Sequence, residues 1–370
     1  MLFVSKPIVA PFHDGTKCFV RDVATRLERV EPIVMAHPGA PPLPGREDIR
    51  RVNVYPDRGS FTPRLQDNAR AAIWLLLASR ADVWHFVFAP NERTSRIARV
   101  LSRSRRVPTL QTVASPPRDF SRAERLLFGD CVVAQSRWTA EQLTRALGPR
   151  GRRRPIEVIP PPVAEIEPRS PEACAALRAQ LGIDPRATVF VYPGDLEFSS
   201  GAQLVADAVR GLVERNPAAV VVFAYRAKTP AAAEVAARLE AELAGLPVRF
   251  AASLADVLVL ISTAEAVLFP VDDLYGKVDH PIVLLEAMQL GVPVITLDSG
   301  PLMDLGGVEK IPLADAGLLV EAACGVAANP DRRARIVAAQ RAAIAERHHA
   351  DIVAARYEAL YLELLGGRRA

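Results

Sequence analysis

Short apolar runs alternate with segments of helical periodicity along almost the whole chain. The runs are rich in Val, Ile, Leu and Phe, which is typical of strands buried on both faces of a sheet. Their alternation with helical segments predicts βαβ units and an α/β protein with parallel sheets. In the first half, the pattern predicts strands at 33–35, 83–86, 109–112, 131–134 and 157–159, and helices at 17–27, 63–77, 94–102 and 139–147.

A break in this pattern divides the chain into two domains. Three consecutive prolines at 160–162 are followed by a polar, proline-dotted stretch that reaches Pro171. Such a stretch suits a linker, and a chain of 370 residues is long enough for two separate cores. The alternation then resumes, with strands at 189–192, 220–223, 248–250, 266–269 and 294–295, a helix at 201–212 and a C-terminal helical segment at 352–365.

Residues 279–295 predict one short helix with a complete start and stop, followed by a strand. Pro281 suits the first helical position, because proline has no N–H to leave unpaired and its φ is already helical. Gly291 suits the left-handed residue that ends a helix, and Pro293 prevents the helix from continuing. We therefore expect the helix to lie between Pro281 and Gly291.

Glu286 is the unusual residue of this helix, because its carboxylate lies within an otherwise apolar turn. A charge in such a place is costly unless it has a partner, and the hydroxyl groups of a ligand would be one. The first N–H groups of the helix, those of Ile282 and Val283, are free to receive a phosphate. Phosphate donors together with a carboxylate that binds hydroxyls indicate a site for a nucleotide sugar.

The string Glu-Ala-Met-x-x-Gly-x-Pro-Val at 286–294 resembles the signature of glycosyltransferase family 4, which consists of retaining enzymes of the GT-B fold. Weaker matches at 82–85, 132–136, 158–161 and 193–196 extend the resemblance over nearly the whole chain. An ordinary helix-to-strand unit of another α/β protein would share the caps but not the whole string. The resemblance implies two facing Rossmann-like domains with parallel sheets, an acceptor-side domain at 1–162 and a nucleotide-sugar-binding domain at 163–348, with a helix at 349–370 that crosses back to the first.

The resemblance also implies the reaction. A sugar would move from a nucleotide diphosphate sugar to a hydroxyl of a glycan, glycolipid or small molecule, with retention of anomeric configuration. Glu286 falls on the family's glutamate that binds the ribose of the donor, and the leaving phosphate would help to deprotonate the acceptor. We see no nucleophile–base pair and no metal-ligand cluster in the sequence, so we expect a metal-independent enzyme without a cofactor. The alternative is a catalytically degenerate GT-B protein that binds a sugar nucleotide or a partner without turnover.

Departures from the family pattern motivate that alternative. The family carries an Arg and a Lys in the loop after the first strand of the second domain, where this chain has Asp195 and Ser200. Acids there would repel a diphosphate unless they point away from it or hold a cation. The family's first glutamate falls at Val278, and its donor-sugar histidine falls near Ala114.

Neighbouring residues are candidates for the missing roles, and each also has a structural alternative. Asp279 could replace the lost glutamate or simply cap the helix after it. Arg226 and Lys228 could reach the diphosphate or face solvent. His85 could contact the acceptor or be a core histidine. The predicted catalytic residues are Asp279 and Glu286, and the predicted donor-binding residues are Gly15, Lys17, Gly194, Asp195, Ser199, Ser200, Arg226, Lys277, His280, Ile282, Val283 and Glu286.

The charge of the chain is clustered rather than large. The formal net charge is +4 and the pI about 9.0, but arginines gather at 103–106 and 150–154. These runs are either solvated loop charge or a contact for anionic lipid headgroups. No aromatic-interleaved basic surface is evident, so we expect no nucleic-acid partner.

The sequence predicts a cytoplasmic protein. If the arginine runs contact lipid headgroups, we also expect a peripheral contact with the inner face of the membrane. The four cysteines are scattered without metal or redox spacing, as reduced thiols are. The apolar run at 2–4 is too short for a signal peptide, and no apolar stretch is long enough to span a bilayer.

Overall fold

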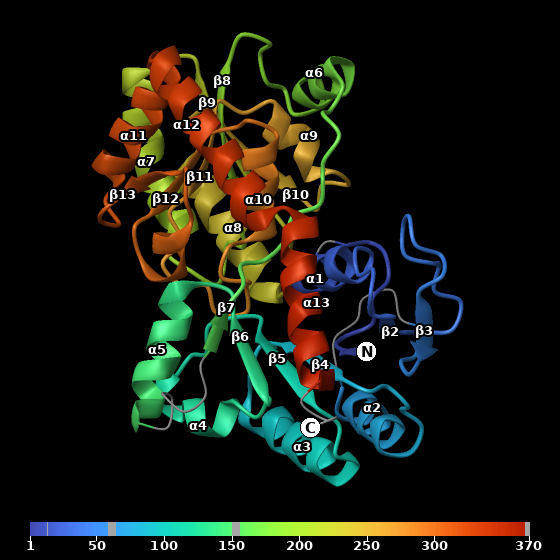
Figure 1. The fold of residues 1–370 in the computed structure, drawn as a ribbon. Coiled ribbons are helices and arrows are strands. Elements are labelled where there is room, and N and C mark those ends of the chain that lie inside the picture. The colour runs from blue at the N-terminus through green and yellow to red at the C-terminus, as the bar shows by residue number, and fades with distance from the viewer. Residues whose placement is uncertain (13, 58–63, 150–155, 367–370) are drawn as a thin grey trace. The chain divides into compact units, whose positions relative to one another are not determined.

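The structure is a computed structural model that describes residues 1–12, 14–57, 64–149 and 156–366. The chain forms two compact units (Figure 1). Unit 1 consists of Met1–Ala164, Tyr275–Ile282 and Arg347–Ala370, and unit 2 consists of Glu165–Leu274 and Val283–Glu346. The sequence analysis expected limits at 162 and 348, and it did not predict that Tyr275–Ile282 packs with unit 1.

Unit 1 contains one parallel sheet. In its described part, seven strands follow the order β3-β2-β1-β4-β5-β6-β7. Successive side chains on a strand face opposite sides of the sheet, so Leu2 and Met35 join one core while Phe3 and Val34 join the other. The strands are β1 (Leu2–Val4), β2 (Ile33–Ala36), β3 (Arg50–Asn53), β4 (Trp84–Phe88), β5 (Thr109–Val113), β6 (Cys131–Ala134) and β7 (Ile156–Val158).

The helices of unit 1 cover both faces of this sheet. They are α1 (Gly15–Ala24), α2 (Leu65–Leu77), α3 (Glu92–Arg105), α4 (Ala123–Leu126), α5 (Arg137–Leu147) and α13 (Ala350–Gly366), with a 3₁₀ turn at Phe120–Arg122. The helix expected at 63–77 is α2, and the residue at which we expected it to begin lies outside the described residues, as does the arginine run at 150–154. α2 and α3 share a core with the strands through Ala71, Leu75 and Ala98.

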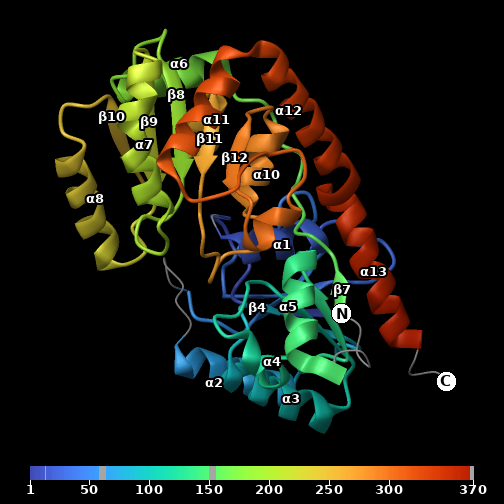
Figure 2. The same ribbon diagram turned by 90° about the vertical axis from the view of Figure 1, so that its left-hand side faces the viewer.

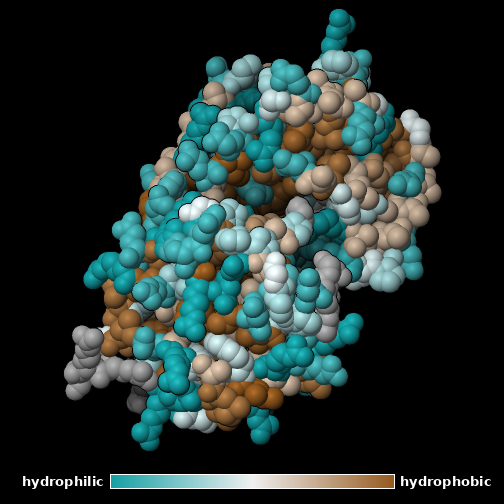
Figure 3. Space-filling model, turned by 90° about the vertical axis from the view of Figure 1, so that its right-hand side faces the viewer, coloured by the Kyte–Doolittle hydropathy of each residue, from teal (hydrophilic) through white to brown (hydrophobic). Residues whose placement is uncertain are grey.

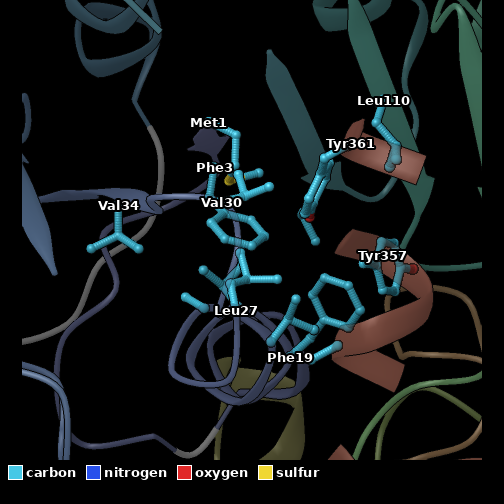
Figure 4. Close-up of a cluster of buried hydrophobic side chains, with 14 of the residues drawn as sticks. Met1, Phe3, Phe19, Leu27, Val30, Val34, Leu110, Tyr357 and Tyr361 are labelled. Atoms are coloured by element: carbon cyan, nitrogen blue, oxygen red, sulfur yellow. The ribbon is translucent and has the colours of Figure 1, made fainter. Parts of the chain in front are cut away.

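The C-terminal helix α13 is part of the core of unit 1, and it packs against α1. Tyr357 and Tyr361 are fully buried and meet Phe19 and Phe3 edge to face, with ring centroids 5.3 and 6.5 Å apart (Figure 4). Edge-to-face pairs add stability beyond the apolar area that they bury. Glu358, on the same helix, accepts hydrogen bonds on one carboxylate oxygen from the backbone N–H groups of residues 28–30, at 2.7–3.1 Å.

Unit 2 contains a second parallel sheet, with six strands in its described part in the order β10-β9-β8-β11-β12-β13. α7 and α11 lie together on one face of this sheet, and α6 and α9 lie together on the other (Figures 1 and 2). The strands are β8 (Thr188–Pro193), β9 (Ala219–Tyr225), β10 (Val248–Ala252), β11 (Ala266–Phe269), β12 (Val294–Leu297) and β13 (Glu309–Ile311). The helices are α6 (Pro171–Gln180), α7 (Gly201–Arg215), α8 (Pro230–Glu242), α9 (Val257–Ser262), α10 (Ile282–Gln289), α11 (Ala316–Ala328) and α12 (Pro330–Ala343), with a 3₁₀ turn at Gly300–Asp304 and a π turn at Ile344–His348.

The α/β class and the parallel sheets expected from the sequence are confirmed. Within the residues that the structure describes, none of the helices combines the length and the apolar character needed to cross a bilayer. Two strands of unit 1, β1 and β3, were not expected. β3 reads Arg-Arg-Val-Asn and lies at the sheet edge, where polar side chains are tolerated, so it carries no apolar run.

Candidate functional site

The helix α10 begins and ends where the sequence predicts. It starts at Ile282, directly after Pro281, and Gly291 follows its last turn with a left-handed φ of 73°. The N–H of Val292 donates to the carbonyl of Ala287 at 3.0 Å, which closes the helix end in the usual Schellman manner. The first turn of α10 is also the place where the chain passes from unit 1 to unit 2.

Glu286 lies on the accessible side of α10. Leu284, Leu285, Ala287 and Met288 around it have no exposed surface, whereas Glu286 is half-buried. Glu286 therefore keeps some exposed surface, although its neighbours in the sequence are apolar. A half-buried side chain beside fully buried neighbours can receive a hydroxyl-bearing ligand without unfolding of the helix.

The loop between β8 and α7 depends on two glycines. A Cβ at Gly194 would lie 2.6 Å from the ring of Tyr192, and a Cβ at Gly201 would lie 2.8 Å from Val271. The hydroxyl of Tyr192 donates to the carbonyl of Asp195 at 2.9 Å. Glycine is thus needed at both ends of the loop because neighbouring side chains pack directly against its backbone.

Asp195, where the resemblance implies an arginine, holds a cation. Its side chain is almost fully buried, and the Nζ of Lys228 lies 2.8 Å from one carboxylate oxygen and 3.0 Å from the other. Lys228 comes from the loop after β9, and its side chain is 41% exposed. We expected an acid at this position to repel a diphosphate unless it held a cation. Lys228 is that cation, and Arg226 in the same loop is exposed.

Ser200, where the resemblance implies a lysine, is held by a second acid. Its hydroxyl donates to Asp272 at 2.8 Å, and its backbone N–H donates to the same carboxylate at 3.2 Å. The hydroxyl of Ser199 accepts from the N–H of Gly201 at 3.4 Å. These contacts fix the loop that leads into α7 and place its hydroxyl groups at the carboxyl edge of the unit 2 sheet.

In unit 1, Asp14 caps α1, the helix that begins at Gly15. Its carboxylate accepts from the N–H groups of Thr16 and Lys17 and pairs with Lys6 at 2.8 Å. Burial acts to raise the pKa of Asp14, but Lys6 and the two N–H groups outweigh it, and the net pKa lies below its ordinary value. Burial lowers the pKa of Lys17, whose ammonium donates to the carbonyl of Val9 at 3.1 Å.

Gly15 allows α1 to approach the segment Tyr275–Ile282. A Cβ at Gly15 would lie 3.1 Å from the side chain of Val278. Two hydroxyl groups of unit 1 hold the same segment, since Ser136 donates to Asp279 at 2.6 Å and Ser115 accepts from the N–H of Gly276 at 2.8 Å. The sequence singled out Ser136 only as a family match, without this contact. The start of α10 is therefore fixed by contacts within unit 1.

Two predicted site residues of this segment are more deeply buried than their roles require. Asp279 and His280 have no exposed surface, and the ring of His280 packs against that of His348 with centroids 5.3 Å apart. Lys277 is half-buried. The carboxylate of Asp279 is tied to Ser136, so its contact in this structure is with the protein.

His85 lies inside the core of unit 1. Its Nδ1 is 2.7 Å from the hydroxyl of Tyr361, and its Nε2 is 2.7 Å from the hydroxyl of Thr112. Burial lowers its pKa well below the ordinary value. These contacts are those expected if His85 is a core histidine. The alternative, a contact of His85 with the acceptor, stays a prediction. In the described part of the chain, no three His, Cys, Asp or Glu side chains are grouped as metal ligands would be.

Two sheets of parallel strands with helices on both faces, one in each unit, define the GT-B class of fold, and solved structures of that class match the chain over almost its whole length. Residues 187–329, from just before β8 to just after α11, match the sequence family described as Glycosyl transferases group 1. The match contains the β8–α7 loop, Lys228 and the whole of α10.

Three solved structures illustrate the likeness. Anabaena HepE in complex with UDP and glucose is 16% identical, with a TM-score of 0.73 over 98% of each chain. A glycosyltransferase from Rickettsia africae is 16% identical, with a TM-score of 0.72 over 98% of each chain. WaaG, a glycosyltransferase involved in lipopolysaccharide biosynthesis, is 16% identical, with a TM-score of 0.63 over 97% of this chain and 98% of that one. A comparison with curated protein sequences found no match.

Proposed function

We propose that this protein is a retaining glycosyltransferase of family 4 that transfers a sugar from a nucleotide diphosphate sugar to an acceptor hydroxyl. The observation that carries the proposal is α10. It lies within the segment that matches the group 1 glycosyl transferases, and it carries Glu286 half-buried between fully buried neighbours in the sequence. The chemistry requires stabilisation of the negative charge that builds on the leaving diphosphate, and N–H donors with nearby cations supply it.

The donor would bind along the carboxyl edge of the unit 2 sheet, as ligands of doubly wound folds do. Glu286 would accept hydrogen bonds from the ribose hydroxyls, and the N–H groups of Ile282 and Val283 would receive the diphosphate. Lys228 would supply the positive charge that the β8–α7 loop lacks. Its ammonium has three N–H donors, so it can keep Asp195 and still bind a phosphate oxygen.

The residues of unit 1 near α10 would act by positioning. Asp279, with no exposed surface and bound to Ser136, would hold the start of α10 rather than touch the sugar, and we assign it this role in place of the catalytic one. Gly15 would let α1 reach the same segment. Lys17, Lys277 and His280 stay predicted donor contacts, and the enzyme would work without a metal ion.

A second function, binding of a sugar nucleotide without turnover, is favoured by a specific observation. The acid at the family's arginine position is neutralised by Lys228, so the net charge of this pair is zero where the family has a free cation. A loop of this kind could still hold a nucleotide through Glu286. It would stabilise a leaving diphosphate less well, because only part of the lysine charge remains for the phosphate.

Incubation with UDP-, GDP- and ADP-glucose separates these functions. UDP-glucose comes first, because the HepE structures contain UDP and UDP-glucose. Release of the nucleotide, together with an upward shift of the melting temperature by the same nucleotide, would support the transferase. A thermal shift without release or transfer would support the binding protein. If none of the three donors caused nucleotide release or a thermal shift, the result would contradict both the transferase and the binding protein.

A further inference from the structure

The helices α2 and α3 expose aliphatic side chains on the surface of unit 1. Leu65 is 83% exposed and Leu77 is 73% exposed, and Ile73, Ile97 and Val100 are also exposed. Exposed residues of this size gathered on neighbouring helices are unusual in a soluble domain, where apolar patches of this kind mark interaction surfaces. We call the exposed sides of α2 and α3 together the α2–α3 face.

The exposed residues follow helical spacing. On α2, Leu65, Ile73 and Leu76 recur at intervals that place them on one side, while Ala71 and Leu75 face the core of unit 1. The helix is thus apolar on two sides, one packed and one open. Packing within unit 1 explains only the first side.

The polar positions of the same face carry positive charge. Between 64 and 80 and between 92 and 106, the exposed charged residues are arginines: Arg64, Arg70, Arg80, Arg93, Arg96, Arg103, Arg105 and Arg106. The two acids in these ranges do not offset them, because Asp67 is 2% exposed and Glu92 pairs with Arg122 and Arg125. In Figure 3, brown surface lies among teal at the lower end of the view, the end at which Figure 1 shows α2 and α3.

We propose that the α2–α3 face docks the protein on an anionic lipid surface. Aliphatic side chains would enter the boundary between headgroups and acyl chains, and the arginines around them would bind lipid phosphates, as amphipathic interfacial helices do. The arginines match the charge of an anionic lipid surface, and the apolar residues favour lipid over a protein partner. Protein hot spots are enriched in Trp, Tyr and Arg and poor in Leu and Val, whereas the exposed large apolar residues of this face are Leu, Ile and Val.

The α2–α3 face includes the arginine run at 103–106. The sequence allowed two interpretations of this run, solvated charge or lipid contact, and the proposal selects lipid contact. The run forms the C-terminal end of α3, and the exposed Val100 lies about one helical turn before Arg103. The proposal is independent of the proposed sugar transfer, because it concerns residues of α2 and α3 and a ligand that is not the donor.

Flotation of the full chain with lipid vesicles tests the proposal without any nucleotide sugar. Vesicles of phosphatidylcholine with about one third phosphatidylglycerol should capture the protein at 0.1 M salt, whereas phosphatidylcholine alone should not, and higher salt should weaken capture. The double variants Ile73→Ser/Leu77→Ser and Arg96→Glu/Arg103→Glu should each reduce the partition coefficient at least about tenfold. All four side chains are exposed, so the fold should be retained, and an unchanged melting temperature checks this.

Matched controls come from unit 2. Leu313→Ser, at a side chain that is 66% exposed, and Arg210→Glu, on the exposed side of α7, should leave vesicle capture unchanged. Failure of the wild type to bind anionic vesicles would overturn the proposal. So would equal losses in the face variants and the controls. A concentration-dependent dimer that the face variants dissociate, without vesicle binding, would assign the face to a second copy of the chain instead.

Discussion

The ion pair of Asp195 and Lys228 joins the β8–α7 loop to the loop after β9, and a double-mutant cycle measures its strength. Removing one partner of a fully buried ion pair costs about 3–5 kcal/mol, because the other charge is left buried without compensation. Here the carboxylate is almost fully buried but the lysine side chain is 41% exposed, so solvent screens the pair and reduces the cost. We expect Lys228→Met to lower the free energy of unfolding by about 1–2 kcal/mol.

The second single variant and the double variant show whether the cost of Lys228→Met comes from the ion pair. Asp195→Asn should cost less, about 0.5–1 kcal/mol, because the freed lysine can return to solvent. The double variant should be close to Asp195→Asn alone, so the coupling energy should equal the cost of Lys228→Met, about 1–2 kcal/mol. Urea unfolding gives the free energies, and Arg226→Met, at an exposed cation in the loop that carries Lys228, is the control. A cost for Lys228→Met no larger than that of the control would refute the pairing.

The same variants report on the donor. If Lys228 supplies charge to the diphosphate, Lys228→Met should weaken UDP binding about tenfold, while Asp195→Asn should keep or strengthen it, since the lysine is then shared with no acid. Equal weakening by both variants would show that the pair acts only by shaping the loop.

Three further predictions concern the fold around the site. Burial lowers the pKa of His348 to about 4, whereas its pKa in the unfolded chain is near 6.5, so the unfolded chain binds the proton first as pH falls. The free energy of unfolding should therefore fall by about 3 kcal/mol between pH 6.5 and pH 4. His348→Gln should reduce this pH dependence in urea unfolding. Glu358→Gln should lower the melting temperature of unit 1, at a cost of about 1–2 kcal/mol, because an uncharged oxygen then accepts the three N–H donors. Gly194→Ala should destabilise unit 2 by about 2 kcal/mol in thermal unfolding, since its Cβ would overlap the ring of Tyr192, whereas Gly366→Ala, where a Cβ meets nothing, should change little.

The sequence predicted the elements whose signals are local. The limits of α10 follow from Pro281 and Gly291, whose backbone preferences do not depend on the rest of the chain, and the structure confirms both. Apolar runs marked most central strands for the same reason. The edge strand β3 was missed because an edge does not require an apolar run, and its pairing with β2 depends on residues far away in the sequence.

Pairings between loops could not be predicted. The contact of Asp195 with Lys228 joins two loops that follow neighbouring strands, and the 2.8 Å distance depends on how both loops turn. The contact of Ser136 with Asp279 joins residues 143 positions apart, so no local pattern carries it. His85 shows the same limit, because only the packing of α13 provides Tyr361 as its partner.

Calorimetric titration of UDP into the wild type and into Glu286→Ala tests the central claim most directly. We expect the wild type to bind, and the variant to bind at least about tenfold more weakly, because the ribose loses hydrogen bonds to a charged group. The melting temperature without ligand should change little, and Glu321→Ala, at an exposed position on α11, should bind as the wild type does. Equal affinity of the wild type and Glu286→Ala for UDP would contradict the account.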